Sequence, residues 1–283
     1  WRKKYFKEFK GTRKNAREQV NIDWDKFYNL LDLFAEYFAT NSVNLNVISF
    51  DEYEGDDIIA KITQCSGADK IIIANDADLF QLLYFDEINN EFTFQFSPNN
   101  KNRNLFCTHS FLKYISENIN IQEFLNDNNI DLKIVNPLIS LTDKVLFGKK
   151  SNNTDSVFKL IDGLNKKINR RVLKKYEPLL ETKNHQEFLE TRLDILKIIK
   201  NGINEILPNI SSDIKDKVFE NIDLFYKLNN LNYKMDFEID LNELSPFRSI
   251  KEITEFTLIY ELFGINLEQI KKKSLVNITQ EIF

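Results

Sequence analysis

The sequence predicts an α/β fold in which helices flank a mostly parallel central sheet, followed by a largely helical C-terminal region. Two patterns support this prediction. Strand-type and helix-type segments alternate between residues 24 and 83, which is the order typical of parallel sheets with flanking helices. From about residue 109 onward, apolar residues recur mainly at helical spacing.

The alternating half of the chain contains four segments with clear periodicity. Residues 24–38 carry apolar side chains at helical spacing and predict a helix, whereas 43–50 alternate apolar and polar residues and predict a strand. A short helix is expected at 56–64. Three consecutive isoleucines in 70–74 predict a strand that is buried on both faces. Another short helix is expected at 79–83.

Two later segments complete the expected layout. Phe92, Phe94 and Phe96 alternate with other residues, so 86–108 predicts a β-hairpin or meander. The stretch 116–136 is polar and rich in Asn, and we expect it to form an insertion or a peripheral element.

Length and composition set limits on function. With 283 residues, 42% of them hydrophobic, the chain can bury a core as one large domain or two small ones. Its two cysteines give no disulfide or zinc framework and suit a reducing cytoplasm. No apolar run is long enough to span a bilayer, so no membrane partner is expected. The net charge of -5 argues against a uniformly basic nucleic-acid binder but allows local basic patches.

Two acidic clusters are the most informative feature of the chain, because each lies where a predicted strand meets a predicted helix. Their members are Glu54, Asp56 and Asp57 in the first cluster and Asp76 and Asp78 in the second. Ligands of open α/β sheets bind at the carboxyl ends of the strands, so we expect these carboxylates to converge. Close carboxylates repel one another and resist desolvation unless a cation neutralises them. Oxygen ligands favour Mg²⁺ or Mn²⁺, ions that support phosphodiester hydrolysis.

Simpler interpretations exist for several of these polar residues. Asp56 and Asp57 could sit in the first turn of a helix, where the helix dipole favours acids. The two histidines, His109 and His185, lie in none of the motifs and are expected to be ordinary surface or core residues. Two acidic clusters in matching positions nevertheless favour the metal interpretation.

Positive charge gathers in two segments. Residues 1–17 are cationic with interleaved aromatics, and 166–175 repeats Lys and Arg at three- and four-residue steps, which predicts a basic helix face. Either segment could be an ordinary solvated surface, but two of them flanking an acidic centre favour contact with a phosphate backbone. The turn at 147–163 is dense in Gly, Lys, Ser and Asn, and the exposed backbone N–H groups of such turns can grip phosphates.

Four segments follow one another in a set order: the basic opening, the EGDD segment, the DADLFQL segment after a strand and the GKKSNN turn. In this order they resemble the flap endonuclease/5′-nuclease superfamily, most closely its phage ribonuclease H branch. The resemblance covers about residues 1–175 and is more diffuse beyond them. It implies a PIN/5′-nuclease-like fold in which the acidic motifs carry the metal ligands Glu54, Asp56, Asp57, Asp76 and Asp78.

The resemblance also implies how nucleic acid is held. The family's basic element near the scissile phosphate matches 9–13, which makes Lys10 and Arg13 the expected catalytic side chains. The family's helix–three-turn–helix, which binds duplex backbone with help from a monovalent cation such as K⁺, matches 148–163. The further expected DNA contacts are Arg2, Lys3, Lys4, Lys7, Lys14, Gly148, Lys149, Lys150, Ser151, Asn152, Lys167, Arg170 and Arg171.

The chain departs from the family pattern in two respects. The family's first metal-binding aspartate lies on an N-terminal strand, and a second precedes the basic opening. This sequence starts at Trp1, so we expect that strand and those two ligands to be missing. The family's turn carries acids that serve a second metal, whereas this turn has Lys149 and Asn152. We hypothesise that Lys149 weakens the second metal and contacts phosphate itself.

The predicted function is a Mg²⁺- or Mn²⁺-dependent 5′-nuclease acting on flap DNA or RNA primers in phage-type replication. We expect a monomer in the cytoplasm of a bacterial host, with a sliding clamp or single-strand DNA-binding protein as a possible partner. Its expected regions are a nuclease core at 1–110, a duplex-binding region at 111–180 and a helical region at 181–283. Two alternatives stay open. One is a catalytically impaired, structure-specific DNA-binding member, favoured by the two expected missing aspartates and by Lys149. The other is a PIN-like ribonuclease, disfavoured by the 148–163 turn and the basic helix after it.

Overall fold

The chain forms two compact units in a computed structural model. The first unit comprises Trp1–Asp23 and Ile48–Leu241, and the second comprises Trp24–Val47 and Asn242–Phe283. The structure describes residues 1–7, 9, 20, 22–41, 48–50, 53–65, 69–98, 103–117, 119–148, 156–159, 168, 170–231 and 237–239. In the second unit it describes one helix, α3 (Trp24–Asn41), which confirms the helix predicted at 24–38. The strand predicted at 43–50 lies mostly outside the described residues, and 48–50 form no regular element.

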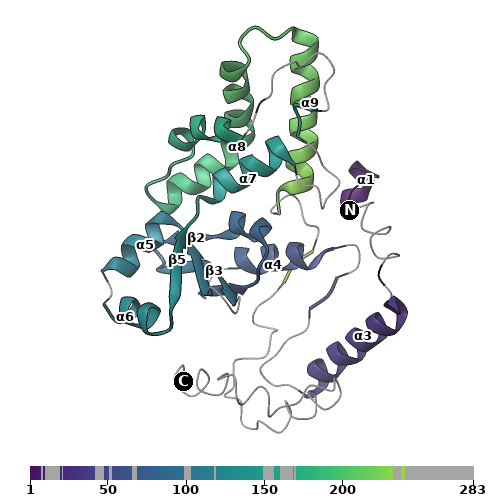
Figure 1. Ribbon diagram of the computed structural model, residues 1–283, viewed down its shortest axis with the longest axis vertical. Helices are drawn as coiled ribbons and strands as arrows, with labels where there is room; N and C mark the ends of the chain where they lie inside the picture. Colours follow the sequence, from purple (N-terminus) through teal and green to yellow (C-terminus); the bar gives the residue numbers. More distant parts are fainter. Residues whose placement is uncertain are drawn as a thin grey trace. The chain divides into compact units, whose positions relative to one another are not determined.

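A five-stranded mixed sheet lies at the centre of the first unit (Figure 1). Its strands are β1 (Lys70–Ile73), β2 (Tyr84–Asp86), β3 (Glu91–Pro98), β4 (Arg103–Cys107) and β5 (Ile130–Ile134). β1 pairs in parallel with β3, and β4 in parallel with β5, whereas β3 is antiparallel to both β2 and β4. The α/β prediction and the predicted meander are confirmed. β1 therefore runs opposite to β4 and β5.

Helices cover both faces of this sheet. Ile72 of β1 packs with residues of α4 (Gly55–Gln64) and of the 3-10 helix η1 (Ala77–Leu82). On the opposite face, residues of β2, β3 and β4 pack against α5 (His109–Ser116) and α6 (Ile119–Asp127) around Phe111. The phenylalanines of β3 point to this second face because side chains alternate along a strand.

Three expectations for this region were wrong in detail. The isoleucine run of β1 is buried on one face only, since Ile71 is 58% and Ile73 70% exposed. Ile71 and Ile73 face the same side of the sheet as the phenylalanines of β3. On that side α5 and α6 pack over β2, β4 and β5 and leave the two isoleucines of β1 exposed. The helix expected at 79–83 is the 3-10 helix η1. The stretch 116–136 is not merely peripheral, because it contributes β5 to the sheet.

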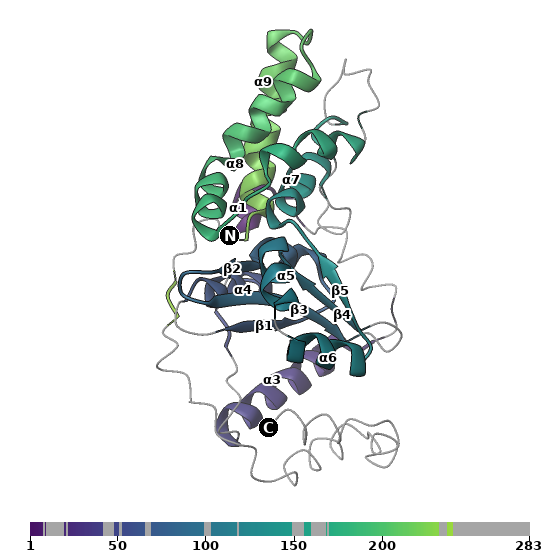
Figure 2. The ribbon, with the colours of Figure 1, turned by 90° about the vertical axis from the view of Figure 1, so that its left-hand side faces the viewer.

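A helical layer lies beyond one end of the sheet (Figures 1 and 2). It is built from α1 (Arg2–Tyr5), α7 (Pro137–Phe147), η3 (Arg170–Lys175), η4 (Glu177–Leu179), α8 (His185–Ile206) and α9 (Ser212–Asn229). Its apolar core includes Tyr176, Ile199 and Phe225, each nearly or fully buried. α8 ends at Ile206, shortly before Pro208, a residue type that interrupts helices. No helix within the described ranges is long and apolar enough to cross a membrane.

The basic cluster at 166–175 is only partly described. Residues 170–175 form the 3-10 helix η3, not the α-helix that the spacing predicts. Gly148 ends α7 with a positive φ of 63°, a conformation that glycine adopts without strain. The rest of the turn that we compared with a helix–three-turn–helix lies mainly outside the described residues.

Candidate active site

The first acidic cluster lies at the start of α4, where a cation from the chain itself meets it. Glu54 is the N-cap, and Asp56 and Asp57 occupy the first turn, as the helix-dipole interpretation expects. Asp57 is fully buried and receives two hydrogen bonds from Arg2, of 2.5 and 2.7 Å. Trp1 Nε1 and the Glu54 backbone N–H also donate to it, at 3.2 and 3.1 Å. Asp57 therefore anchors the chain's first residues and has little capacity left for an added ion.

Arg2 is held on several sides and is only 5% exposed. Its Nε donates to the Leu228 carbonyl at 2.9 Å, and its Nη1 lies 3.4 Å from Glu54 Oε2. This guanidinium joins α1, α4 and α9 within the first unit. We expected Arg2 at the DNA interface, but its place in the interior leaves it unable to reach a duplex, so it is no longer part of the proposed DNA-binding set.

The second acidic cluster follows the carboxyl end of β1, and buried amides hold it in place. Asp76 is the N-cap of η1 and accepts the Asp78 N–H at 2.9 Å. Gln95 of β3 donates to the Ala74 and Asp76 carbonyls at 2.9 and 3.1 Å. The loop that carries Asp76 is thus fixed to the sheet by a side chain that is 1% exposed.

Gln81, from the DADLFQL segment, holds η1 on its other side. Its amide nitrogen donates to the Asp78 and Asn229 carbonyls at 2.9 and 3.1 Å, and its oxygen accepts the Leu231 N–H at 3.0 Å. Gln81 is 1% exposed. Because buried amides need all their hydrogen bonds satisfied, the glutamine of this motif links the acidic loop to the end of α9.

Asp78 also has a cationic partner from the chain. Lys144 of α7 places Nζ 2.8 Å from Asp78 Oδ1 and 2.9 Å from the Ala77 carbonyl. Lys144 is 9% exposed, and the Asp78 side chain is 15% exposed. A largely buried pair of this kind is much less screened by salt than one at the surface. Each acidic cluster is therefore neutralised in part by a lysine or arginine of the protein.

The two clusters match the chemistry of the divalent metal that the sequence implies, but not its geometry. The donor chemistry is suitable, since carboxylate oxygens are the ligands of Mg²⁺ and Mn²⁺. The geometry is not: no group of three or more His, Cys, Asp or Glu among the described residues is placed to hold a metal ion. With Arg2 on Asp57 and Lys144 on Asp78, the five acids do not fit a ready-made metal site.

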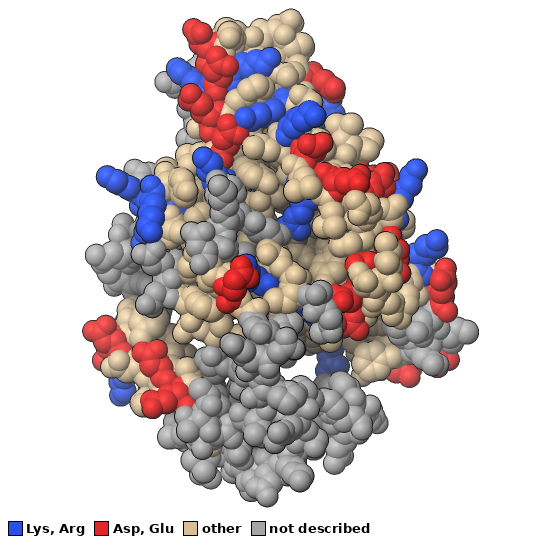
Figure 3. Space-filling model, turned by 180° about the vertical axis from the view of Figure 1, so that it is seen from behind, with Lys and Arg blue, Asp and Glu red and all other residues tan. Residues whose placement is uncertain are grey.

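The remaining predicted contacts divide between exposed and undescribed residues. Lys3, Lys4 and Lys7 are exposed at the N-terminus, and Arg170 and Arg171 are exposed on η3. Arg170 also forms a 2.6 Å ion pair with Asp143. Figure 3 shows acidic and basic side chains intermingled over the helical layer, so that face of the described surface carries no continuous basic band. The predicted contacts that lie outside the described residues are Lys10, Arg13, Lys14, Lys149, Lys150, Ser151, Asn152 and Lys167.

The part of the chain that carries both acidic clusters matches a known protein family. Residues 1–104 match the family of the 5′-3′ exonuclease, N-terminal resolvase-like domain. This part of the chain is similar to the N-terminal domain of 5′-3′ exonucleases. The matched segment contains both acidic clusters, together with β1, β2, β3 and the start of β4.

Two solved structures are similar to the chain. The T5 D15 protein, co-crystallized with metal ions, is 16% identical with a TM-score of 0.41, and the alignment covers 79% of this chain and 80% of that one. The T5 5′-exonuclease with bound divalent metal ions (zinc) is 17% identical with a TM-score of 0.38, covering 80% of this chain and 79% of that one. No curated protein sequence matches the chain.

Several residues that hold the two acidic clusters in place carry no signal in the sequence. Lys144 lies outside every motif, and Gln95 is one polar residue in an aromatic strand. Arg2 is of a residue type that often contacts phosphate, but its guanidinium donates hydrogen bonds to Asp57. Only the glutamine in DADLFQL could have been singled out in advance, as part of the motif itself.

Proposed function

We propose that the chain is a 5′-nuclease that hydrolyses phosphodiester bonds in flap DNA or in RNA annealed to DNA, with Mg²⁺ or Mn²⁺ as its cofactor. The observation that carries this proposal is the family match of residues 1–104, which includes both acidic clusters. In this class of reaction a divalent ion supplies an activated water and stabilises the leaving oxygen. Since the described carboxylates do not form a ready-made metal site, the metal requirement is itself part of the test.

The chain's own residues would divide the remaining work. Asp76 and Asp78, set at the end of β1 by Gln95 and Gln81, would face the scissile phosphate. Exposed lysines of the N-terminal segment and the two arginines of η3 would contact the phosphate backbone. Lys10 and Arg13 keep the role at the scissile phosphate that the family resemblance implies. K⁺ at the 148–163 turn, a sliding clamp and a single-strand DNA-binding protein remain proposals of the same kind.

A second candidate is a structure-specific DNA-binding member of the family that does not cleave. Two ion pairs favour it, Arg2 with Asp57 and Lys144 with Asp78. Both place a positive side chain against carboxylates where a nuclease needs negative charge free for a metal. Binding would then depend on the exposed basic residues alone.

Cleavage and binding of the same substrates separate the two candidates. A 5′-labelled flap duplex and an RNA–DNA hybrid are incubated with the full chain in EDTA and then in increasing Mg²⁺ or Mn²⁺. The nuclease proposal expects cleavage that appears only with the metal and rises to saturation. Tight binding in EDTA, with no cleavage at any metal concentration, would support the binding module instead. Metal-independent cleavage would contradict both.

A further inference from the structure

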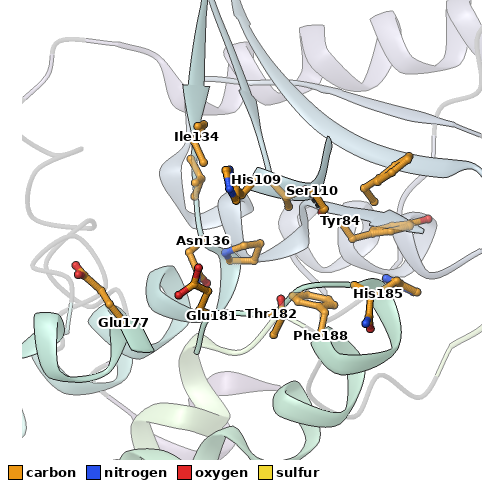
Figure 4. Close-up of a pocket in the computed structure, with 15 residues that line it drawn as sticks. Tyr84, His109, Ser110, Ile134, Asn136, Glu177, Glu181, Thr182, His185 and Phe188 are labelled. Atoms are coloured by element: carbon orange, nitrogen blue, oxygen red, sulfur yellow. Dashed lines mark hydrogen bonds between the residues drawn. The ribbon is translucent and has the colours of Figure 1, made fainter. Parts of the chain in front are cut away.

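A buried polar atom without a hydrogen-bond partner is rare in native proteins and points to a local constraint. Within the described structure, one such atom is His185 Nδ1, beside a cavity of about 230 Å³ (Figure 4). The His185 ring packs between Tyr84 and Phe188, with ring centroids 5.3 and 6.0 Å away, while Lys70 and Arg192 lie over those two rings. The atom and the rings are enclosed by their own neighbours, so His185 is an ordinary packed residue, as expected.

The inner face of β3 holds two more such atoms, Thr93 Oγ1 and Gln95 Oε1. Because side chains alternate along a strand, Thr93, Gln95 and Ser97 share one face of β3, and the phenylalanines take the other. Gln95 is the register partner of Ile72, which packs with residues of α4 and η1. The three polar side chains thus lie within the core, where Thr93 and Gln95 are 1% exposed and Ser97 is 7% exposed.

An apolar side chain would suit the surroundings of Gln95 better than an amide does. Its neighbour in the sheet is Ile72 on one side and Phe106 of β4 on the other. The ring centroid of Phe106 lies 4.6 Å from that of Phe80 in η1. A buried amide costs free energy unless its hydrogen bonds offset the cost, and within the described structure the amide oxygen has no partner. The reason for a glutamine at this position must therefore lie in what its nitrogen binds.

Gln95 fixes the backbone that leads from β1 into the acidic loop. Its Nε2 donates to the Ala74 and Asp76 carbonyls, at 2.9 and 3.1 Å. These carbonyls belong to the residues on either side of Asn75, so a single amide group holds the turn closed. The Asp76 carboxylate accepts the Asp78 N–H at 2.9 Å, which extends the same constraint to the second acid of the cluster.

Ser97 adds a second constraint from the same face of β3. Its hydroxyl donates to Asn75 Oδ1, and the Ala74 N–H donates to the Phe96 carbonyl at 3.1 Å. The parallel ladder between β1 and β3 ends at Ile73. Each of the next three residues is nevertheless held by a backbone or side-chain group of β3, and this continues until the first acid of the cluster.

We propose that Gln95 is a positioning residue for the proposed hydrolysis, supported by Ser97. It holds the Asp76 carboxylate, and through it Asp78, in the direction needed at the reacting phosphate. This role rests on the proposed function. Groups at a reacting centre must be held within a fraction of an ångström of the productive geometry, by partners that are themselves fixed by packing. A buried amide on a central strand meets that requirement.

The test uses three substitutions on the one face of β3. Gln95→Met keeps the length of the side chain and removes its hydrogen bonds, and Ser97→Ala removes the second constraint alone. Thr93→Val is the matched control, because Thr93 is equally buried and makes no hydrogen bond to the acidic loop among those of the described residues. Single-turnover cleavage of a labelled 5′-flap in Mg²⁺ gives a rate constant and a half-saturating concentration. Backbone amide exchange is measured in EDTA without nucleic acid, and circular dichroism confirms folding.

Gln95→Met should lower the rate constant by about ten- to a hundredfold, the scale of a small misplacement of reacting groups. The half-saturating concentration should stay within about twofold, since an interaction that acts in the transition state leaves ground-state binding unchanged. Ser97→Ala should lower the rate constant in the same direction but less. Thr93→Val should cleave at the wild-type rate and be no less stable, because it replaces a buried hydroxyl that lacks a partner.

Amide exchange reads the position of the loop without any cleavage. In Gln95→Met the Asp78 amide, which donates to Asp76, should exchange at least about tenfold faster, as expected when the hydrogen bonds that hold a segment are lost. Amides in the middle of α9 should exchange as in wild type. Faster exchange throughout the first unit would overturn the proposal, because it would give Gln95 a general structural role.

The remaining outcomes also decide. A folded Gln95→Met variant with the wild-type rate constant would overturn the proposal, as would an equal loss of cleavage in Thr93→Val. If Gln95→Met does not fold, the same two measurements on Ser97→Ala decide. If wild type cleaves no substrate, the proposed hydrolysis fails by itself. Faster exchange confined to 74–78 in Gln95→Met would then still show that Gln95 positions the loop, and unchanged exchange there would refute it.

Discussion

Arg2 offers a sharp test of whether a basic residue at the start of the chain serves the fold or the DNA. It is 5% exposed and forms two hydrogen bonds with a carboxylate that is fully buried. Breaking a buried ion pair by removing one partner costs about 3–5 kcal/mol. Asp57 would keep two other donors, Trp1 Nε1 and the Glu54 N–H. We therefore expect Arg2→Met to lower the free energy of unfolding by about 3 kcal/mol.

The measurement is urea unfolding followed by circular dichroism, with Arg2→Met, Asp57→Asn and the double variant. Each single change leaves a buried polar group without its partner, whereas the double change removes both charges. The double variant should thus be at least about 2 kcal/mol more stable than additivity predicts. Lys3→Met, the neighbouring exposed change, is the control and should stay within about 0.5 kcal/mol of wild type. A cost for Arg2→Met no larger than that of the control would refute the reasoning, as would simple additivity.

Three further predictions concern the core and the second ion pair. Burial raises the pKa of the Cys107 thiol to about 12, so at pH 8 iodoacetamide should modify the partly exposed Cys65 and leave Cys107 unmodified in the native protein; mass spectrometry reads both. Gly202→Ala should lower stability by about 1–3 kcal/mol, despite alanine's better helix propensity, because its Cβ would overlap the buried Tyr176 ring; a rise in the melting temperature would contradict this. Lys144→Met leaves its carboxylate partner without a cation and should cost about 3 kcal/mol in urea unfolding; a neutral result would show that the pair is not formed.

Local features of the site could be predicted from the sequence because they depend on neighbouring residues. The acids of the first cluster fall in the first turn of α4, and those of the second follow β1 directly. Helix spacing and the end of an apolar run are enough to place them. The same holds for the helix at 24–38 and the meander.

The features that the sequence did not reveal depend on contacts between distant segments. Arg2 meets Asp57 across 55 positions of the chain, and Lys144 reaches the Ala77 carbonyl across 67. No periodic pattern in the sequence predicts such pairs. The exposed face of β1 was not predicted for the same reason, because three consecutive isoleucines do not indicate where α5 and α6 will pack. The role of Gln95 was missed for this reason too, because the loop that it holds belongs to another segment of the chain.

The central claim is that the acidic clusters carry phosphodiester hydrolysis, and single-turnover cleavage of a labelled 5′-flap in Mg²⁺ tests it most directly. Wild type is compared with Asp76→Asn combined with Asp78→Asn. Because Lys144 would lose its partner, a second variant adds Lys144→Met to the same pair of changes. We predict that wild type cleaves and that both variants bind the flap but lose cleavage by at least about a hundredfold, the scale expected when groups at the reacting phosphate are removed. Cleavage at the wild-type rate by either folded variant would contradict the claim.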